Sequence, residues 1–594
     1  MDDIKIGVGC GVRNGFSLQV LEEALRRGIR YFDTSTFYAV GALADLDGVL
    51  ARMGIDRNDV HISLKLWMTD LGKTRTNDYA AAGLSLWQKY EECRRMFNNI
   101  RFDSIVIHNP LKVDEEGIPE EFIAAEVWPQ LEQLVTVGAV KGIGVSNFNI
   151  VELHRLLETC RIPPVSAQIE FNPYARNQDY VDFCRRKGIK VIGHSPFGFG
   201  WTDGHLALFA DPVIAGLAEK HAVPPARVIL AWIVAKGVAP IPGTTNPAHV
   251  EDFAGALTLA LPPEDIAAID GLNRNKYNYL GIFDYFRAGH HRKYFAADRD
   301  LHALIYNDQN AFEKVSIFDD DFMARVKHGL TQGAGFVVVP GIWADTCRRL
   351  QETLAAKGLT TAGRFNGSGP NLSSILNSGE EILELVDDPV ASLIIESLLG
   401  WDCKLDNISL STSRIAPDNA IFGPHQDSPF DNNPGAPLPP PDYPLVLQII
   451  VAVDEFTETN GPLYVIPHSH KKQQRVIVPW QGGMNFGTLP ETQMKCIVPK
   501  GSAIIAVGHI WHGTHSNVSD APRMGLLMEF VVSVCDARDK FTVNTVTPEL
   551  IEKGSRRVVR LLNNGKLHQH DTPAMLNAFK DQRRPLVQEF AKKK

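Results

Sequence analysis

The sequence predicts a chain of two units, one α/β and one mainly β: a (β/α)8 TIM barrel followed by a jelly roll with flanking helices. Between residue 5 and about 260, eight short apolar runs alternate with amphipathic segments. After Leu272 helical segments come first, and strand-like runs split by Pro, Gly and Asn follow, which is typical of a separate β-rich unit. We expect a barrel at 1–272, a connector at 273–311, a jelly roll at 312–545 and a basic extension at 546–594.

Each of the eight apolar runs has the length of one buried strand in a parallel sheet. The runs are IKIGVGC, RYFDTS, HISLKL, SIVIHN, GIGVSN, SAQIEFN, KVIGHSP and APIPGT. Eight strands separated by helices suit a closed barrel with right-handed crossovers. An open doubly wound sheet is the alternative, and it would need a glycine-rich phosphate turn that opens a helix after its first strand. The GVGCG at 7–11 lacks a helix at that distance, so we favour the barrel.

Composition excludes several classes of protein. Hydrophobic residues make up 44% of the 594 and charged residues 22%, which is typical of folded globular chains. The formal charge of −9 argues against a general nucleic-acid binder, and no apolar run is long enough to span a membrane. The start MDDIKIGVGCGV is unlike a secretory signal, and the eight scattered cysteines form no CxxC pair. We therefore expect a soluble cytoplasmic protein with no nucleic-acid or membrane partner, whose oligomeric state the sequence does not reveal.

Four polar residues fall at or just past the ends of three successive barrel strands. They are Asp33 in RYFDTS, Tyr38 in the loop that follows, Lys65 in HISLKLW and His108 in SIVIHNP. Each alone has an ordinary structural explanation, but strand ends meet at the C-terminal mouth of a barrel, so all four should converge. An ammonium beside a phenol favours its ionised form and lowers its pKa. We expect Lys65 to act so on Tyr38, with Asp33 holding the lysine and His108 orienting a carbonyl oxygen for reduction.

At these four residues the sequence resembles the aldo-keto reductase family, over roughly residues 4–272. The family has an Asp, a Tyr five residues later, a Lys ending the next strand and a His ending the one after. The resemblance implies a nicotinamide cofactor, NADPH or NADH. Its carboxamide contacts would be Ser146 and Asn147 in GVSNFN and Gln168 in AQIEFNPY.

The chain departs from this family at the cofactor site. The family often has a Tyr before Ser-Pro to stack on the nicotinamide, and here His194 takes that place. Many members hold the adenosine 2′-phosphate with a Lys-Ser pair and an Arg, which here are Gly243, Thr244 and His249. Losing two cations weakens the case for NADPH over NADH, although the resemblance still favours NADPH slightly.

A second constellation lies in IFGPHQDSPF. If this segment is extended, His425 and Asp427 point to the same face, as two ligands of one metal must. A second His would complete the facial triad of non-haem Fe(II) oxygenases. The candidates are His509, His512 and His515 in GHIWHGTHSN, and His468 and His470 in PHSH. Spacing alone does not choose among them.

This half of the chain resembles the phytanoyl-CoA dioxygenase family of Fe(II)/2-oxoglutarate oxygenases, over roughly residues 312–545. NGPLYVIPHSH fits the family pattern NGxLxxxPGSH, except that His468 stands at the usual glycine. The resemblance implies a double-stranded β-helix (a jelly-roll or cupin-like fold) in which Arg523, eleven residues after His512, binds 2-oxoglutarate. The implied Fe(II) ligands are His425, Asp427 and His512. A zinc hydrolase is the rival interpretation of the same ligands.

Together these motifs predict a bifunctional oxidoreductase. One site would oxidise a small molecule, such as a specialised metabolite, and the other would reduce a carbonyl, with net inversion of a carbinol as one outcome. The alternative is that only the oxygenase half is catalytic and the barrel is a scaffold or binding module. The loops expected to set substrate choice are 67–80, 197–210 and 428–444.

Overall fold

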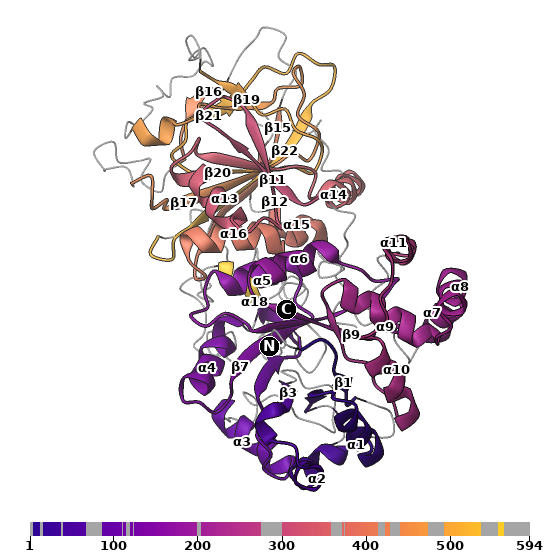
Figure 1. Cartoon of the computed structure of the whole chain (residues 1–594). Coiled ribbons are helices and arrows are strands. Elements are labelled where there is room, and N and C mark those ends of the chain that lie inside the picture. The colour runs from indigo at the N-terminus through magenta and orange to yellow at the C-terminus, as the bar shows by residue number, and fades with distance from the viewer. Residues whose placement is uncertain are drawn as a thin grey trace. The chain divides into compact units, whose positions relative to one another are not determined.

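The chain forms two compact units, Met1–Arg299 and Asp300–Lys594, in the computed structural model shown in Figure 1. The structure describes residues 4–11, 16–36, 38, 40–66, 86–109, 111–113, 119–122, 124–198, 204–274, 300–357, 371–373, 375–413, 422–427, 440–472, 492–535 and 556–562. The loop 67–80, most of 428–444 and most of the basic extension therefore lie outside the described residues, whereas 197–210 is described except at 199–203. Among the described residues, no helix is both long and apolar enough to cross a membrane.

The first unit is the predicted barrel. All eight apolar runs form parallel strands, in the sheet order β1-β2-β3-β4-β7-β8-β9-β10. Their bounds are β1 Val8–Gly9, β2 Tyr31–Ser35, β3 His61–Leu66, β4 Ser104–Ile107, β7 Gly142–Ser146, β8 Ser166–Glu170, β9 Lys190–His194 and β10 Ala239–Pro240. The last strand meets the first because the amides of Gly7 and Gly9 donate to the carbonyls of Pro240 and Pro242, at 2.9 and 3.0 Å. The prolines have no N–H, so this seam uses only their carbonyl oxygens.

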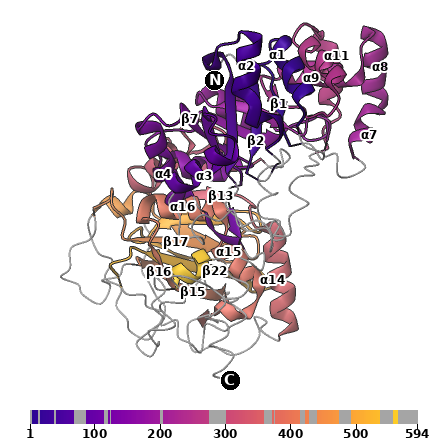
Figure 2. The ribbon, with the colours of Figure 1, turned by 90° about the horizontal axis from the view of Figure 1, so that it is seen from below.

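Helices alternate with these strands and surround the sheet, as Figures 1 and 2 show. They are α1 Leu18–Arg26, α2 Leu46–Met53, α3 Leu86–Met96, α4 Ala124–Thr136, α5 Ile150–Leu157, α6 Gln178–Arg186, α7 Gly204–Phe209, α8 Pro212–His221, α9 Pro225–Ala235, α10 Val250–Gly255 and α11 Pro263–Asp270. Local signals fix their starts: Asn149 and Glu152 form a capping box at α5. A short hairpin, β5 Leu111–Val113 with β6 Pro119–Phe122, follows β4.

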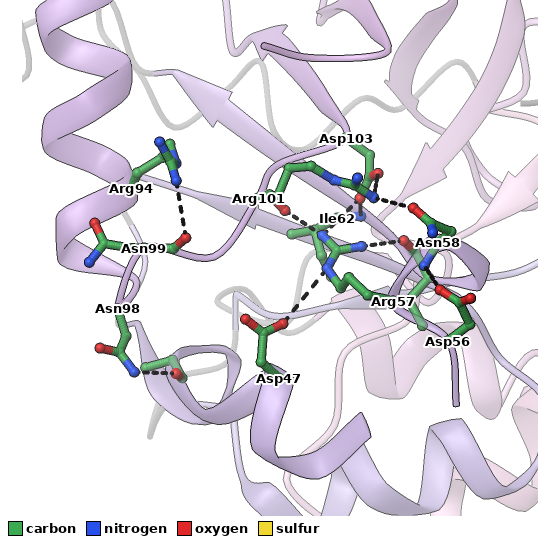
Figure 3. Close-up of polar contacts among 12 residues, drawn as sticks. Asp47, Asp56, Arg57, Asn58, Ile62, Arg94, Asn98, Asn99, Arg101 and Asp103 are labelled. Carbon is green, nitrogen blue, oxygen red and sulfur yellow. Dashed lines mark hydrogen bonds and ion pairs between the residues drawn. The ribbon is translucent and has the colours of Figure 1, made fainter. Parts of the chain in front are cut away.

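A polar network lies at the N-terminal ends of β3 and β4 (Figure 3). Asp103 directly precedes β4 and is fully buried. Its Oδ2 accepts from the Ile62 amide and from Arg57, both at 3.0 Å, and its Oδ1 accepts from Arg101 at 3.2 Å and Lys141 at 3.0 Å. Burial alone would raise the pKa of Asp103, but the Ile62 amide and the surrounding cations lower it. This end of a barrel is remote from its mouth, so we assign the network to stability.

The second unit contains two antiparallel sheets, which agree with the predicted jelly roll. The larger has the order β12-β11-β13-β20-β17-β22-β15-β14, and the smaller β16-β21-β18-β19. The strands of the larger sheet are β11 His302–Tyr306, β12 Phe312–Ser316, β13 Phe336–Val339, β14 Asn371–Ser373, β15 Lys404–Ser413, β17 Val446–Val451, β20 Ala503–Val507 and β22 Arg523–Val531. Those of the smaller are β16 Phe422–His425, β18 Leu463–Val465, β19 Met494–Lys495 and β21 His512–Thr514.

The helices of this unit include several that pack on the larger sheet. They are α13 Phe322–Thr331, α14 Ala344–Ala356, α15 Glu380–Val386, α16 Pro389–Leu399 and α18 Arg556–Leu561. α13 contacts β11, β13 and β20, while α16 contacts β17 and β22 (Figure 1). α18 lies within the predicted basic extension, and its buried Arg557 pairs with Glu396 of α16.

The two faces of the larger sheet differ in polarity. Val337, Ile505, Ile449 and Met528 lie in register across four strands, on the face that Gly329 of α13 approaches at Val337. The opposite face, here called the inner face, carries the residues that alternate with these along each strand. It includes Ile450 and Leu527, Gln448 and Glu529, and Arg523. The first two are register partners and are half-buried, whereas the other three are buried.

One strand falls in the stretch assigned to a connector. β11 at His302–Tyr306 pairs with β12 and β13, so it is part of the second unit. Its alternating pattern, HALIY, is short and follows a stretch rich in charge and aromatic residues. The short run therefore did not stand out from its surroundings as a strand. All eight cysteines are free thiols.

Candidate active sites

The structure brings the four predicted barrel residues together at one end of β2, β3 and β4. Lys65 Nζ donates to Asp33 Oδ2, and both side chains are about 2% exposed. The ammonium also lies 5.3 Å from the centroid of the Tyr38 ring. The edge of the His108 ring faces Tyr38, with the ring centroids 6.3 Å apart. The predicted convergence at the barrel mouth is therefore present.

The charge state of this cluster differs from the sequence-based expectation in one respect. Burial, and then the negative charge of Asp33, raise the pKa of Tyr38, so the expected lowering by Lys65 is wrong for the protein as it stands. The physical reason is that the phenol is withdrawn from water while the ammonium is already paired with Asp33. Burial, and then the positive charge of Lys65, lower the pKa of His108 well below its usual value. At neutral pH Tyr38 is therefore protonated and His108 is neutral.

The predicted nicotinamide contacts join the same network. Gln168 Nε2 donates to Asp33 Oδ1 at 2.8 Å, so both oxygens of that carboxylate are occupied. Asn147 has a left-handed backbone (φ 61°) and its Nδ2 donates to the His108 carbonyl at 2.9 Å and approaches Ser146 Oγ at 3.2 Å. His194 Nε2 lies 3.0 Å from Asn147 Oδ1.

His194 is the residue that departs from the family at the nicotinamide site. Its Nδ1 lies 3.1 Å from Ser195 Oγ, so both ring nitrogens are within hydrogen-bonding distance of polar atoms. Burial and the charge of Lys65 lower the pKa of His194 to about 3, so the ring is neutral. It is the last residue of β9 and lies beside Asn147, as expected for a cofactor contact.

Two residues at the family's phosphate-binding positions form a hydrogen bond with each other. Thr244 Oγ1 lies 2.9 Å from His249 Nδ1 and also accepts from the Asn246 amide at 3.0 Å. The first turn of the following helix, α10, carries Glu251 and Asp252. Both carboxylates are paired with arginines, Glu251 with Arg27 at 3.3 Å and Asp252 with Arg227 at 2.9 Å.

In the second unit, the structure gathers His425, Asp427 and His512. One ligand atom from each lies within 4.8 Å of the others. His425 and His512 are register partners of β16 and β21, and their ring centroids are 4.2 Å apart. Asp427 Oδ2 lies 3.4 Å from His512 Nε2. Because His512 Nδ1 bonds to the Ile510 carbonyl at 3.1 Å, its Nε2 is the nitrogen presented to the cluster.

The competing histidines have other partners. His468 Nδ1 bonds to the Gly333 carbonyl at 3.0 Å, and His470 Nε2 bonds to that of Thr331 at 2.9 Å. The His509 ring meets the edge of His470, and His515 meets that of Tyr464, with centroids 5.9 and 5.1 Å apart. None of the four belongs to the cluster found among the described residues. The backbone of His468 is left-handed (φ 63°), which explains why glycine is usual at this position.

The donor set fits a divalent metal ion. Burial alone would lower the pKa of His512, but the hydrogen bond and charge of Asp427 raise it. A carboxylate that attracts a proton to this imidazole would likewise attract a cation placed between them. Two imidazoles and one carboxylate on one side of an ion are the facial triad of Fe(II) oxygenases.

Arg523, at the start of β22, is a buried cation suited to a carboxylate ligand. It is 6% exposed, its Nη2 donates to the Gly461 carbonyl, and its guanidinium lies 4.2 Å from the Phe456 ring centroid. Its Nε has no hydrogen-bond partner, and no ion pair joins it to a carboxylate within the described ranges. Burial lowers the pKa of Arg523 to about 10, which leaves it charged at neutral pH. A buried charge with an unused donor is costly unless an anion binds it.

Sequence reasoning missed the other polar residues of the inner face. Gln448 is fully buried, and its Nε2 lies 3.5 Å from the carbonyl of Gly508. Glu529 is its register partner and accepts from Asn407 Nδ2 at 2.6 Å. A signal was present, because Gln448 and Glu529 are single polar residues within the apolar runs LVLQIIVAV and MGLLMEFVVSV. Neither run has the helical or alternating pattern that would have assigned the residue to a face.

Comparisons with known proteins match each unit separately. Residues 11–274 match the model of the aldo/keto reductase family, and residues 237–525 match that of the phytanoyl-CoA dioxygenase (PhyH) family. The two matches overlap at 237–274, where β10, α10 and α11 belong to the barrel.

Three curated relatives that match the first unit are named as aldose or xylose reductases. An aldose reductase of Encephalitozoon cuniculi is 31% identical over 288 residues, which cover 45% of this chain and 89% of the relative. Aldose reductase B of Dictyostelium discoideum is 30% identical over 285 residues, covering 45% and 89%. A probable NAD(P)H-dependent D-xylose reductase of Emericella nidulans is 30% identical over 289 residues, covering 44% and 88%.

The fold and the two sites define an oxidoreductase that joins a parallel barrel to an antiparallel β unit. Through its barrel, this chain belongs to the aldo/keto reductase family, and its second unit carries a domain of the phytanoyl-CoA dioxygenase family.

Proposed function

We propose that the chain is a bifunctional oxidoreductase acting on a small molecule, such as a specialised metabolite. The second unit oxidises the substrate with Fe(II), 2-oxoglutarate and O₂, and the barrel reduces a carbonyl with NADPH or NADH. The observation that supports this proposal is that one chain contains two complete sets of chemically matched side chains. Oxidation of a carbinol followed by re-reduction would invert its configuration if the hydride adds to the face opposite the one that lost hydrogen.

In the oxygenase unit, His425, Asp427 and His512 would hold Fe(II) from one side and leave the other side open. When bound, iron with 2-oxoglutarate and O₂ supplies an oxidation coupled to decarboxylation to succinate. Arg523 would pair with the far carboxylate of 2-oxoglutarate through its unused guanidinium edge. The apolar side chains of Ile450 and Leu527, half-buried on the inner face, would contact the substrate.

In the reductase unit, a bound nicotinamide supplies the hydride. Tyr38 would give its phenolic proton to the carbonyl oxygen, and the Lys65 ammonium would stabilise the phenolate left behind. Asp33 holds Lys65 in place. If the Ser35 hydroxyl donates to His108 Nδ1, 3.1 Å away, the neutral ring keeps its proton on Nε2, and this N–H can donate a hydrogen bond to the carbonyl oxygen.

Relatives support the nicotinamide assignment, since one of them is named as NAD(P)H-dependent. At the expected 2′-phosphate site the chain lacks the two cations that would favour NADPH over NADH. Thr244 and His249 bond to each other where cations would hold a 2′-phosphate. We keep NADPH as the first cofactor to test and NADH as the second.

A metabolite screen tests the proposal directly. The full chain is supplied with Fe(II), 2-oxoglutarate, O₂ and both nicotinamides, and succinate formation and nicotinamide oxidation are followed together. We expect some compounds to give succinate in stoichiometric excess over the background without substrate, and some carbonyl products to consume NAD(P)H. A chain that binds Fe(II) and 2-oxoglutarate but oxidises no nicotinamide with any carbonyl would contradict the bifunctional assignment.

The second candidate is that the barrel is a non-catalytic scaffold or binding module. The mutual bonding of Thr244 and His249, and His194 at the stacking position, are the observations that favour it. Titration of NADPH and NADH, followed by nicotinamide fluorescence, separates the two candidates. A scaffold barrel binds neither cofactor, and a reductase barrel binds at least one.

A further inference from the structure

Gly508 connects two parts of the second unit through its backbone. It follows β20 directly, and its amide donates to the carbonyl of Val446, the first residue of β17, at 2.9 Å. Its own carbonyl accepts from the amide of Asp427 at 2.7 Å. Gly508 thus joins the larger sheet to the segment that carries one residue of the histidine-aspartate cluster.

No side chain fits at this position. A Cβ on Gly508 would lie 2.5 Å from the carbonyl oxygen of Asp427 and 2.6 Å from Cβ of Val446. Both atoms belong to the backbone or are attached directly to it, so neither can rotate away as the end of a long side chain could. Relief would require the Asp427 segment and β17 to move apart.

The Gly508 carbonyl is further constrained by Gln448. This fully buried side chain lies on the inner face, with its Nε2 3.5 Å from the same oxygen that accepts from Asp427. The carbonyl therefore lies between the ligand segment and a residue of β17, and its hydrogen bond from the Asp427 amide is the shorter of the two contacts. A shift of this carbonyl would move the Asp427 backbone with it.

The position of Asp427 matters because metal ligands tolerate little displacement. Ligand distances are held to about 0.2 Å, and residues that orient ligands typically change metal affinity 10–100-fold when altered. The three ligand atoms already lie within 4.8 Å of one another. A backbone displacement on the order of 1 Å at Asp427 would take its carboxylate out of this cluster.

We propose that Gly508 is a positioning residue of the metal centre, whose missing side chain lets its backbone hold Asp427 where the carboxylate meets His425 and His512. The inference rests on the metal site of the proposed function. It adds a role to a residue that contacts no metal itself.

The test is Co(II) binding to the full chain, followed by the visible d–d absorption of the bound ion. In Gly508→Ala we expect the dissociation constant for Co(II) to rise about 10–100-fold. The matched control is Gly329→Ala, in which the new Cβ would lie 3.0 and 3.1 Å from Ile305 and Val337 on the opposite, helix-covered face. This control should lower the melting temperature while keeping Co(II) affinity within about twofold of wild type.

The outcomes separate three explanations. Wild-type affinity in Gly508→Ala would overturn the inference, and so would an equal loss in Gly329→Ala, because affinity would then follow stability alone. If Gly508→Ala does not fold, Val446→Ala replaces it, since it trims atoms packed on Gly508 without adding any. We expect that variant to raise the dissociation constant for Co(II), and unchanged binding would overturn the inference. If the wild-type chain binds no Co(II), the proposed metal site itself fails.

Discussion

Arg523 offers the sharpest quantitative test of the oxygenase site. Replacing it by Lys keeps a positive charge but loses the planar guanidinium, which donates to Gly461 and leaves its Nε for a ligand. A lysine ammonium cannot make both contacts in the same geometry. The loss of one charge-assisted hydrogen bond to the cosubstrate is worth about 2 kcal/mol, or roughly a 30-fold weaker dissociation constant for 2-oxoglutarate.

Arg523→Leu removes both the hydrogen bonds and the charge. It leaves the far carboxylate of 2-oxoglutarate buried and unpaired, which costs about 4 kcal/mol, or roughly 1,000-fold in affinity. Both variants are measured by anaerobic calorimetry of 2-oxoglutarate binding to the Co(II)-loaded chain. Arg348→Lys, on the exposed surface of α14, is the control and should change nothing. A change of less than about threefold in Arg523→Leu would refute the assignment.

Three further predictions concern stability and charge. Asp103→Asn places an amide where Oδ2 accepts from Ile62 and Arg57, so it should cost about 3 kcal/mol. By calorimetry, the melting temperature of the barrel should fall by about 6 °C or more. Glu92→Gln, which removes only the charge of a partly exposed ion pair with Lys89, should cost less than about 1 kcal/mol. Because the folded-state pKa of Asp103 is lowered, the contribution of its carboxylate to the free energy of unfolding is complete above about pH 4 and is lost as the pH falls further. An Asp103→Asn variant with the wild-type acid-unfolding profile would contradict this. His468→Ala keeps the left-handed backbone but loses the hydrogen bond to Gly333, so it should destabilise the second unit by about 1 kcal/mol in urea unfolding. His468→Gly should be nearly neutral, because glycine adopts this backbone without strain. Equal losses in the two variants would argue against backbone strain.

Much of the barrel could be predicted because its signals are local. All eight strands coincide with apolar runs, and strand order fixes which end carries Asp33, Lys65 and His108. The charge state of Tyr38 could not be predicted, because it depends on burial that the loop sequence does not reveal. The cofactor preference also remains a prediction, because Thr244 and His249 replace the residues that would hold a 2′-phosphate.

The second unit was harder to predict from sequence. Spacing left five histidines as candidates for the third ligand, and only the pairing of β16 with β21 brings His512 to His425. The roles of Gly508 and Gln448 depend on contacts between segments far apart in the chain. The strand β11 was assigned to a connector because five residues carry too little pattern to stand out.

The central claim is that the two sites act in sequence on one small molecule. A Tyr38→Phe variant keeps the ring beside Lys65 but has no phenolic proton to donate. Its products are compared with those of wild type by mass spectrometry, with Fe(II), 2-oxoglutarate, O₂ and NADPH present and with a substrate that gives succinate. We predict that succinate forms at the wild-type rate while a carbonyl intermediate accumulates, two mass units lighter than the carbinol. The normal product at the normal rate would contradict the claim.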